Sequence, residues 1–151
     1  MSKGYLLDTN VLSATAPDRL PVADVEKQAA RAWIRQHDGL LWLPIVAIGE
    51  IAAGIGEREG SGATRHAAEL SAWLRNVLLS YPERVLGYGM TEALCCRQLA
   101  ATARQNGVQA AFADMSVASI AMTNDLVVAT RNTKHFVPMG TEVINPFIIQ
   151  P

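Results

Sequence analysis

The chain has 151 residues, 50% of them hydrophobic and 18% charged, with a formal net charge of −1 at pH 7, which fits one domain spanning residues 1–151. The near-neutral charge excludes a uniformly basic nucleic-acid binder, although it is compatible with a local basic rim around an acidic site. The adjacent Cys95 and Cys96 make neither a disulfide framework nor a zinc site, and no apolar stretch approaches the roughly 20 residues that span a bilayer, so we expect a cytoplasmic protein without a membrane segment.

The hydrophobic pattern predicts strands and helices in alternation. In chain order it predicts a strand at 5–8, a helix at 24–38, a strand at 40–44, helices at 45–57 and 63–81, a strand at 84–88, helices at 91–107 and 113–125, and strands at 126–130 and 142–145. Thr91 and Gly107 suit the two caps of one helix. The strands are apolar throughout, which is typical of a parallel sheet covered on both faces. The predicted fold is therefore an α/β/α sandwich around a central, mostly parallel sheet.

Four polar residues occupy positions from which their side chains could form a functional site. Asp8 ends the first strand, Asn132 follows the fourth, and Asp114 opens the helix before the fourth strand. Glu50 lies in an apolar helix, where a buried carboxylate needs a partner or a metal. Because ligands of such folds bind at the carboxyl ends of the strands, all four side chains can reach one crevice.

Each of these residues also has a purely structural interpretation. Asp8 can close a turn with Asn10, and Asp114 can stabilise the first turn of its helix. Glu50 can lie on a solvated helix face, and Asn132 can be a turn residue. What favours a common site is that the four positions converge on the same edge of the sheet.

Carboxylates gathered within a few ångströms raise one another's pKa values, and a hard divalent cation removes that penalty. Mg²⁺ and Mn²⁺ prefer oxygen ligands and keep several waters. We therefore predict that Asp8, Asp114 and Glu50 bind Mg²⁺ or Mn²⁺. The histidines are scattered along the sequence and suggest no zinc site: His37, His66 and His135.

The segments around these residues resemble the PIN-domain family, and most closely the VapC-type toxins of bacterial toxin–antitoxin pairs. The resemblance rests on "YLLDTNVLSA" (5–14), "IVAIGEIAAGI" (45–55), "ADMSVASIA" (113–121), "LVVATRNTKHF" (126–136) and "VINPF" (143–147). It spans nearly the whole chain and implies a PIN-like, Rossmann-like fold and a Mg²⁺- or Mn²⁺-dependent endoribonuclease. It further implies an acidic catalytic triad of Asp8, Glu50 and Asp114, with Asn132 at the fourth catalytic position.

The sequence departs from the common family pattern at three places. Asn132 is neutral where the family has a variable acid, which argues against a permanently occupied second metal site. His135 stands where the family often has Asp, and Gly87 and Gly89 lie where it often has an acid. We expect the changes at these last positions to leave the triad untouched.

The resemblance also implies the reaction and the supporting residues. The cation polarises a phosphate and lowers the pKa of a bound water, and the products carry a 5′-phosphate and a 3′-hydroxyl. Thr9, Asn10 and Thr130 are expected to orient the acids. Arg131 and Lys134 flank the site and are expected to bind RNA phosphates, although ordinary solvated charge is an equally good interpretation.

The resemblance implies three partners: an RNA substrate, a cognate antitoxin and a second copy of the chain, within a homodimer or a larger assembly. The apolar helices 63–81 and 91–107 are compatible with burial at such interfaces. Two other functions are open. One is a PIN-fold RNA- or antitoxin-binding module with weak activity, suggested by Asn132. The other is an aspartyl-phosphate phosphotransferase, which Asn10 opposes because that class usually has Asp two residues after the nucleophile.

Overall fold

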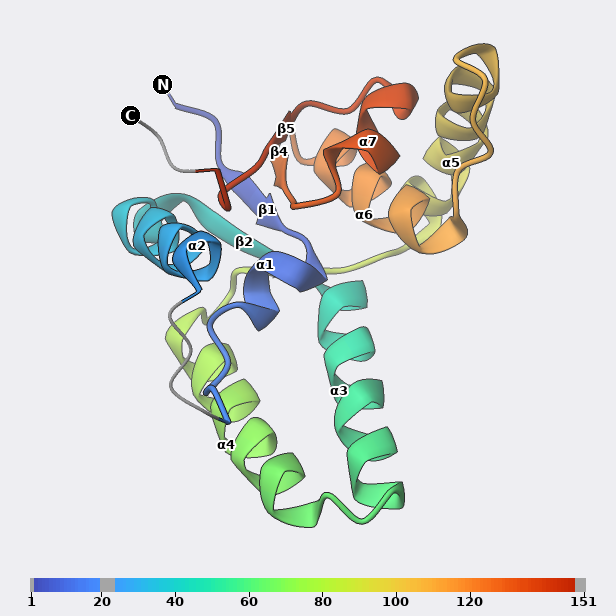
Figure 1. Ribbon diagram of the computed structural model, residues 1–151. Coiled ribbons are helices and arrows are strands. Elements are labelled where there is room, and N and C mark those ends of the chain that lie inside the picture. The colour runs from blue at the N-terminus through green and yellow to red at the C-terminus, as the bar shows by residue number, and fades with distance from the viewer. Residues whose placement is uncertain (1, 20–23, 149–151) are drawn as a thin grey trace.

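The computed structural model of the protein describes residues 2–19 and 24–148. A sheet of five strands, all parallel, lies at its centre in the order β3-β2-β1-β4-β5 (Figure 1). The strands are β1 (Tyr5–Leu7), β2 (Leu41–Pro44), β3 (Val85–Leu86), β4 (Val127–Ala129) and β5 (Val143–Ile144). Each of them lies inside one of the strands predicted from the sequence.

The predicted helices are also present, with small shifts at their ends. They are α2 (Val25–Gln36), α3 (Ile45–Gly60), α4 (Thr64–Ser80), α5 (Met90–Gln105) and α6 (Phe112–Thr123). The pattern missed the short helices α1 (Thr9–Ser13) and α7 (Thr133–Phe136) and the 3₁₀ turns η1 (Asp38–Leu40) and η2 (Val137–Met139). These elements are too short to show a hydrophobic period.

The predicted caps of helix α5 need correction. Thr91 is not the N-cap, because α5 already begins at Met90 and the cap is Gly89. The Glu92 carboxylate accepts the Gly89 N–H at 2.9 Å, so an acid in the first turn satisfies the backbone there. The C-cap is Asn106, and Gly107 follows it with a positive φ of 77°, the left-handed conformation that glycine adopts without strain.

Helices cover both faces of the sheet, and neighbouring residues of β1 point to opposite faces. Leu7 packs with side chains of α1, α2, α3 and α4, including Ile34. Leu6 packs on the other face with side chains of α5 and α6, including Leu99 and Ile120. Because side chains alternate between the two faces of a strand, β1 contributes to two separate hydrophobic cores. The predicted α/β/α sandwich with a parallel sheet is confirmed.

The strand order reverses next to β1. From β1 the chain continues to β2 and β3 on one side, and it returns to place β4 and β5 on the other. The Asp8 N–H donates to the Ala129 carbonyl at 2.9 Å, so the carboxyl ends of β1 and β4 are held side by side. In open parallel sheets such a switch point is where ligands bind.

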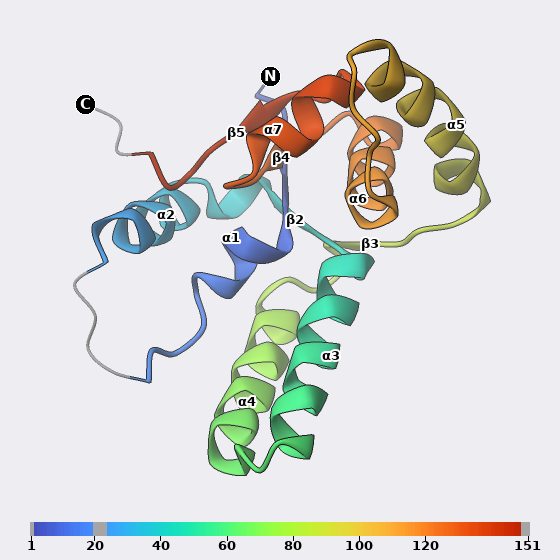
Figure 2. The ribbon, with the colours of Figure 1, turned by 45° about the vertical axis from the view of Figure 1, so that its right-hand side comes forward.

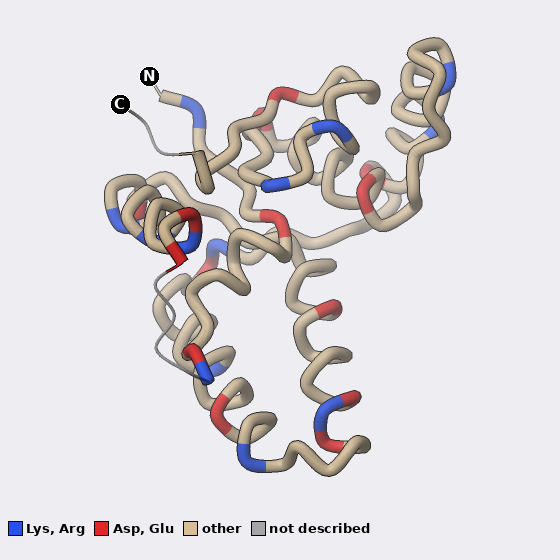
Figure 3. Tube along the Cα trace, viewed as in Figure 1, with Lys and Arg blue, Asp and Glu red and all other residues tan. Residues whose placement is uncertain are grey.

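Helices α3 and α4 form a hairpin that extends away from the sheet in both ribbon views (Figures 1 and 2). The turn between them contains Gly62 at a φ of 89°, a conformation that strains residues with a Cβ and therefore favours glycine. Basic and acidic positions are interspersed over the trace, in keeping with the net charge near zero (Figure 3). Among residues 2–19 and 24–148, no helix combines the length and apolarity that crossing a bilayer demands.

Candidate functional site

Asp8 lies where β1 ends and α1 begins, and only 8% of it is exposed. Its Oδ1 accepts the Thr9 N–H at 2.9 Å, which makes Asp8 the N-cap of α1. Its Oδ2 accepts the Thr130 hydroxyl at 2.8 Å and the Asn10 side-chain N–H at 3.2 Å. The sequence thus folds locally so that a capping role fixes the carboxylate at the switch point.

The electrostatic environment of Asp8 is unfavourable for its charged form. Burial raises the pKa of the Asp8 carboxyl above its ordinary value, and the hydrogen bonds from Thr130 and Thr9 only partly offset this. The negative charges of Asp114 and Glu50 raise the pKa of Asp8 further. No Lys, Arg or His in the described part of the chain pairs with Asp8. A cation bound beside Asp8 would remove this imbalance.

Thr130, directly after β4, connects the polar groups around Asp8. Its hydroxyl donates to Asp8 and accepts from the Asn132 backbone N–H at 3.0 Å and from Asn10 Nδ2 at 3.4 Å. The Asn10 amide oxygen accepts the Arg131 N–H at 3.0 Å. The three residues expected to orient the acids, Thr9, Asn10 and Thr130, are therefore all in hydrogen-bond contact with Asp8.

We predict that Thr130→Val lowers metal affinity or activity on the order of 10–100-fold, the usual effect of losing a group that orients a metal-binding side chain. Valine keeps the shape of threonine but gives Asp8 no proton. Titration calorimetry with Mn²⁺ measures the change. The control is Thr141→Val, because the Thr141 hydroxyl is buried without a hydrogen-bond partner. Equal affinities in the two variants would contradict the role of Thr130.

Glu50 has a different environment from the one its sequence context suggested. The interpretation of Glu50 as a buried carboxylate is wrong, because α3 buries Ala47, Ile51 and Ile55 while Glu50 lies on the solvated face that was the alternative. Its Oε2 accepts the Thr9 hydroxyl at 2.9 Å. Thr9 thus joins two acids, with its backbone N–H on Asp8 and its side chain on Glu50.

Asp114 lies in the first turn of α6, whose N-cap is Ala111, and its side chain is 25% exposed. Its Oδ2 lies 3.3 Å from Nδ1 of His135 on α7. The expectation that the change to His at this position leaves the triad untouched is corrected here, because His135 contacts Asp114. The sequence signal was the separation of three residues between His135 and Asn132, which places both on one turn of helix.

The other residues predicted for the site, Asn132, Arg131 and Lys134, differ in the contacts that their side chains make. Asn132 is exposed at the N-cap of α7, and its side chain makes no capping hydrogen bond. The Arg131 guanidinium donates to Glu26 at 2.9 Å and lies 4.0 Å from the centre of the Phe147 ring. Lys134 is exposed on α7. The Arg131 side chain is therefore partly occupied by protein contacts.

The carboxylate oxygens of Asp8 and Asp114 are ligands of the kind that a hard divalent cation prefers, and such a cation could be bound partly through water. Among residues 2–19 and 24–148, no group of three His, Cys, Asp or Glu side chains is arranged to bind one metal ion. Mg²⁺ usually keeps several waters and is bound through one or two carboxylates, so three direct ligands are not needed. The buried, unpaired charge of Asp8 with Asp114 nearby meets that requirement.

Comparisons with known proteins agree on one group of relatives. No family model matches the chain. It is 35% identical over 148 residues to the plasmid stability protein StbB of Pseudomonas syringae pv. tomato, covering 94% of this chain and 97% of that protein. It is 28% identical over 150 residues to the VapC ribonuclease Y4jK of Sinorhizobium fredii, covering 94% and 96%. The crystal structure of FitAcB from Neisseria gonorrhoeae superposes with a TM-score of 0.77 at 26% identity, covering 96% of this chain and 99% of that one.

Proposed function

Because the chain belongs to the PIN-domain family of VapC-type proteins, we propose that it is the toxin of a toxin–antitoxin pair. In this proposal it is an endoribonuclease that uses Mg²⁺ or Mn²⁺ to hydrolyse RNA. The observation that carries the proposal is Asp8: a carboxylate buried at the switch point of a parallel sheet, without a basic partner in the described residues and with Asp114 and Glu50 nearby. Without a cation, the charged form of Asp8 is unfavourable. A bound cation would stabilise that charge and could activate a water for hydrolysis.

The side chains divide the work as follows. Asp8 and Asp114 would hold the ion, which would supply polarisation of the phosphate and a lowered pKa for a bound water. Thr130 and Thr9 fix the Asp8 carboxylate by hydrogen bonds. Glu50, an exposed acid whose Oε2 accepts the Thr9 hydroxyl, would help Asp8 and Asp114 to hold the ion. Asn132 contributes an uncharged amide at the edge of the site.

The proposal includes a cognate antitoxin and a second copy of the chain as partners. Large apolar side chains at the starts of α5 and α6 support a protein interface: Met90, Leu94 and Phe112 are 76%, 69% and 65% exposed. Apolar side chains exposed in this number on neighbouring helices are typical of contact surfaces.

The alternative of an aspartyl-phosphate enzyme has less support. Both Asp8 oxygens accept hydrogen bonds from the protein, and the residue two positions later, Asn10, is one of the donors. No lysine of the described residues lies in contact with Asp8 to stabilise a phosphorylated form. The geometry favours a carboxylate that binds a cation.

The test is incubation of the purified chain with total cellular RNA in the presence of Mn²⁺, Mg²⁺ or a chelator, followed by mapping of the cut ends. We expect cleavage with either ion, 5′-phosphate ends on the downstream fragments, and no cleavage in excess chelator. Equal cleavage with chelator would exclude the metal mechanism. Absence of cleavage under every condition, with the protein folded, would favour the binding-module alternative.

A further inference from the structure

A groove lies between the hairpin of α3 and α4 and the segment that follows α1. We propose that this α3–α4 groove binds the phosphate backbone of single-stranded RNA and leads the strand into the acidic site. It has a volume of about 370 Å³, and it begins at the site itself, with Thr9 and Glu50 in its wall. This inference rests on the proposed function and adds to it a path for the substrate.

The groove carries more basic than acidic side chains. Arg19, Lys27, Arg58 and His66 line it, against the carboxylates of Asp18 and Glu50. One of these acids, Asp18, is paired with Lys27 and Arg31. Because Lys27 is itself paired with Asp18, the positive charge that an anionic strand would meet in the groove is mainly that of Arg19 and Arg58.

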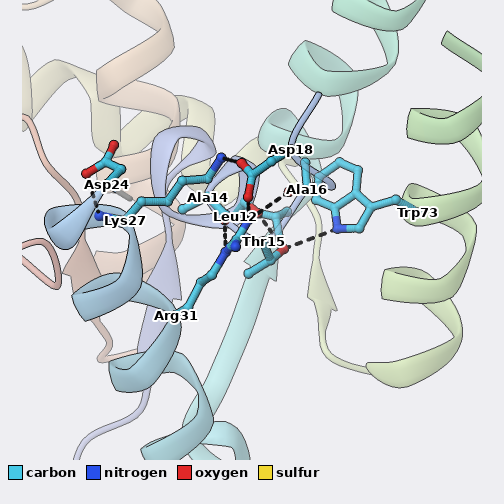
Figure 4. Close-up of polar contacts among 9 residues, drawn as sticks. All are labelled: Leu12, Ala14, Thr15, Ala16, Asp18, Asp24, Lys27, Arg31 and Trp73. Carbon is cyan, nitrogen blue, oxygen red and sulfur yellow. Dashed lines mark hydrogen bonds and ion pairs between the residues drawn. The ribbon is translucent and has the colours of Figure 1, made fainter. Parts of the chain in front are cut away.

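Asp18 is held by two cations of α2 (Figure 4). Its Oδ1 contacts the Lys27 ammonium, and its Oδ2 lies 3.1 Å from the Arg31 guanidinium. Arg31 also donates to the carbonyls of Ala14 and Ala16 at 2.7 and 2.9 Å. These contacts fix the segment after α1 against α2, so this wall of the groove is preformed and its acid is paired.

The opposite wall, helix α3, brings both Glu50 and the Arg58 guanidinium to the groove. Glu50 and Arg58 are eight residues apart on α3, and the helical rise separates them by roughly 12 Å along the axis. Arg58 Nη1 donates to the Gly54 carbonyl at 2.9 Å, which holds the guanidinium back along the helix. The guanidinium is thus oriented before a ligand arrives.

The position of the groove favours RNA over an acidic protein segment as its occupant. The phosphate that reacts must lie beside Asp8 and Glu50, and neighbouring phosphates of the same strand follow within a short distance. The groove continues from that point, whereas Arg131 on the other side of the site is engaged by Glu26. Arginine contacts of this kind position a nucleic-acid backbone without reading its bases.

The test is made with Arg58→Gln in the background of Asp8→Asn, which is expected to bind RNA without cutting it. Fluorescence anisotropy measures binding of a short labelled single-stranded RNA over a range of salt concentrations. We expect Arg58→Gln to weaken binding several-fold and to reduce the slope of log K against log salt by about 0.7, as loss of one phosphate contact on a single strand predicts. The control is Arg75→Gln, an equal charge change at an exposed residue of α4 that lines a separate pocket between α3 and α4.

Cleavage assays separate this inference from the proposed function. With Asp8 intact, Arg58→Gln should raise KM for long RNA with kcat unchanged and leave cleavage of a dinucleotide as it was. If the parent chain cuts RNA and Arg58→Gln behaves like Arg75→Gln in every assay, the groove inference is wrong and the nuclease stands. If the parent chain cuts nothing but Arg58→Gln alone weakens RNA binding, the groove stands without the nuclease. Equal weakening for oligoglutamate of matched charge would overturn the assignment to RNA.

Discussion

Asp8→Asn should abolish metal-dependent RNA cleavage and the growth arrest that expression of an active toxin causes, while the protein stays folded. The substitution removes the charge that the cation needs but keeps an oxygen for the Thr9 N–H, and Asn is as good an N-cap as Asp. A loss of about 4 kcal/mol in transition-state stabilisation, a reasonable share of what a bound metal supplies, corresponds to roughly 10³-fold in rate. Cleavage assays and colony counts measure the effect.

The matched control is Asp24→Asn. Asp24 is also an N-cap, and its side chain accepts the Lys27 N–H at 3.1 Å at the start of α2. The same charge and the same kind of helix cap are therefore changed away from the acidic site. We expect full cleavage by Asp24→Asn. If both variants lose activity together, general destabilisation explains the loss, and if both remain active, the chain is not a nuclease that depends on Asp8.

The position of the candidate site could be predicted from the sequence because it depends on the order of the strands and helices. Apolar strands without alternation indicated a parallel sheet, and a parallel sheet brings its strand ends to one edge. Asp8 and Thr130 each follow such a strand directly, and the structure joins them by a hydrogen bond of 2.8 Å. Helix α3 was recognised as well, and so was the place of Glu50 on it.

The surroundings of each site residue could not be predicted in the same way, because they depend on contacts between distant segments. Glu50 was expected among buried side chains, but α3 leaves the sheet as part of a hairpin and exposes that face. The partner of Arg131 is Glu26, 105 residues away, and no local pattern indicates it. The contact of His135 with Asp114 requires α7, which is only four residues long.

The raised pKa of Asp8 has a consequence for the stability of the metal-free protein. In the unfolded chain Asp8 titrates near 3.8, and in the folded protein burial raises its pKa above that value. Between these two pKa values the folded state binds more protons than the unfolded state. The free energy of unfolding therefore falls as pH rises through this window, and the loss persists at neutral pH.

Asp8→Asn lacks this titration, so we expect the variant to be more stable than the parent chain at pH 7 in excess chelator and to lose that advantage towards pH 4. Urea unfolding of both proteins at several pH values measures the difference, and groups common to the two cancel. Mn²⁺ at about 100 times its Kd should stabilise the parent chain by about 2.7 kcal/mol and the variant far less. A difference between the proteins that does not change with pH would show that the Asp8 carboxyl is not strained by its burial. A difference that changes with pH but is insensitive to Mn²⁺ would place the cation elsewhere.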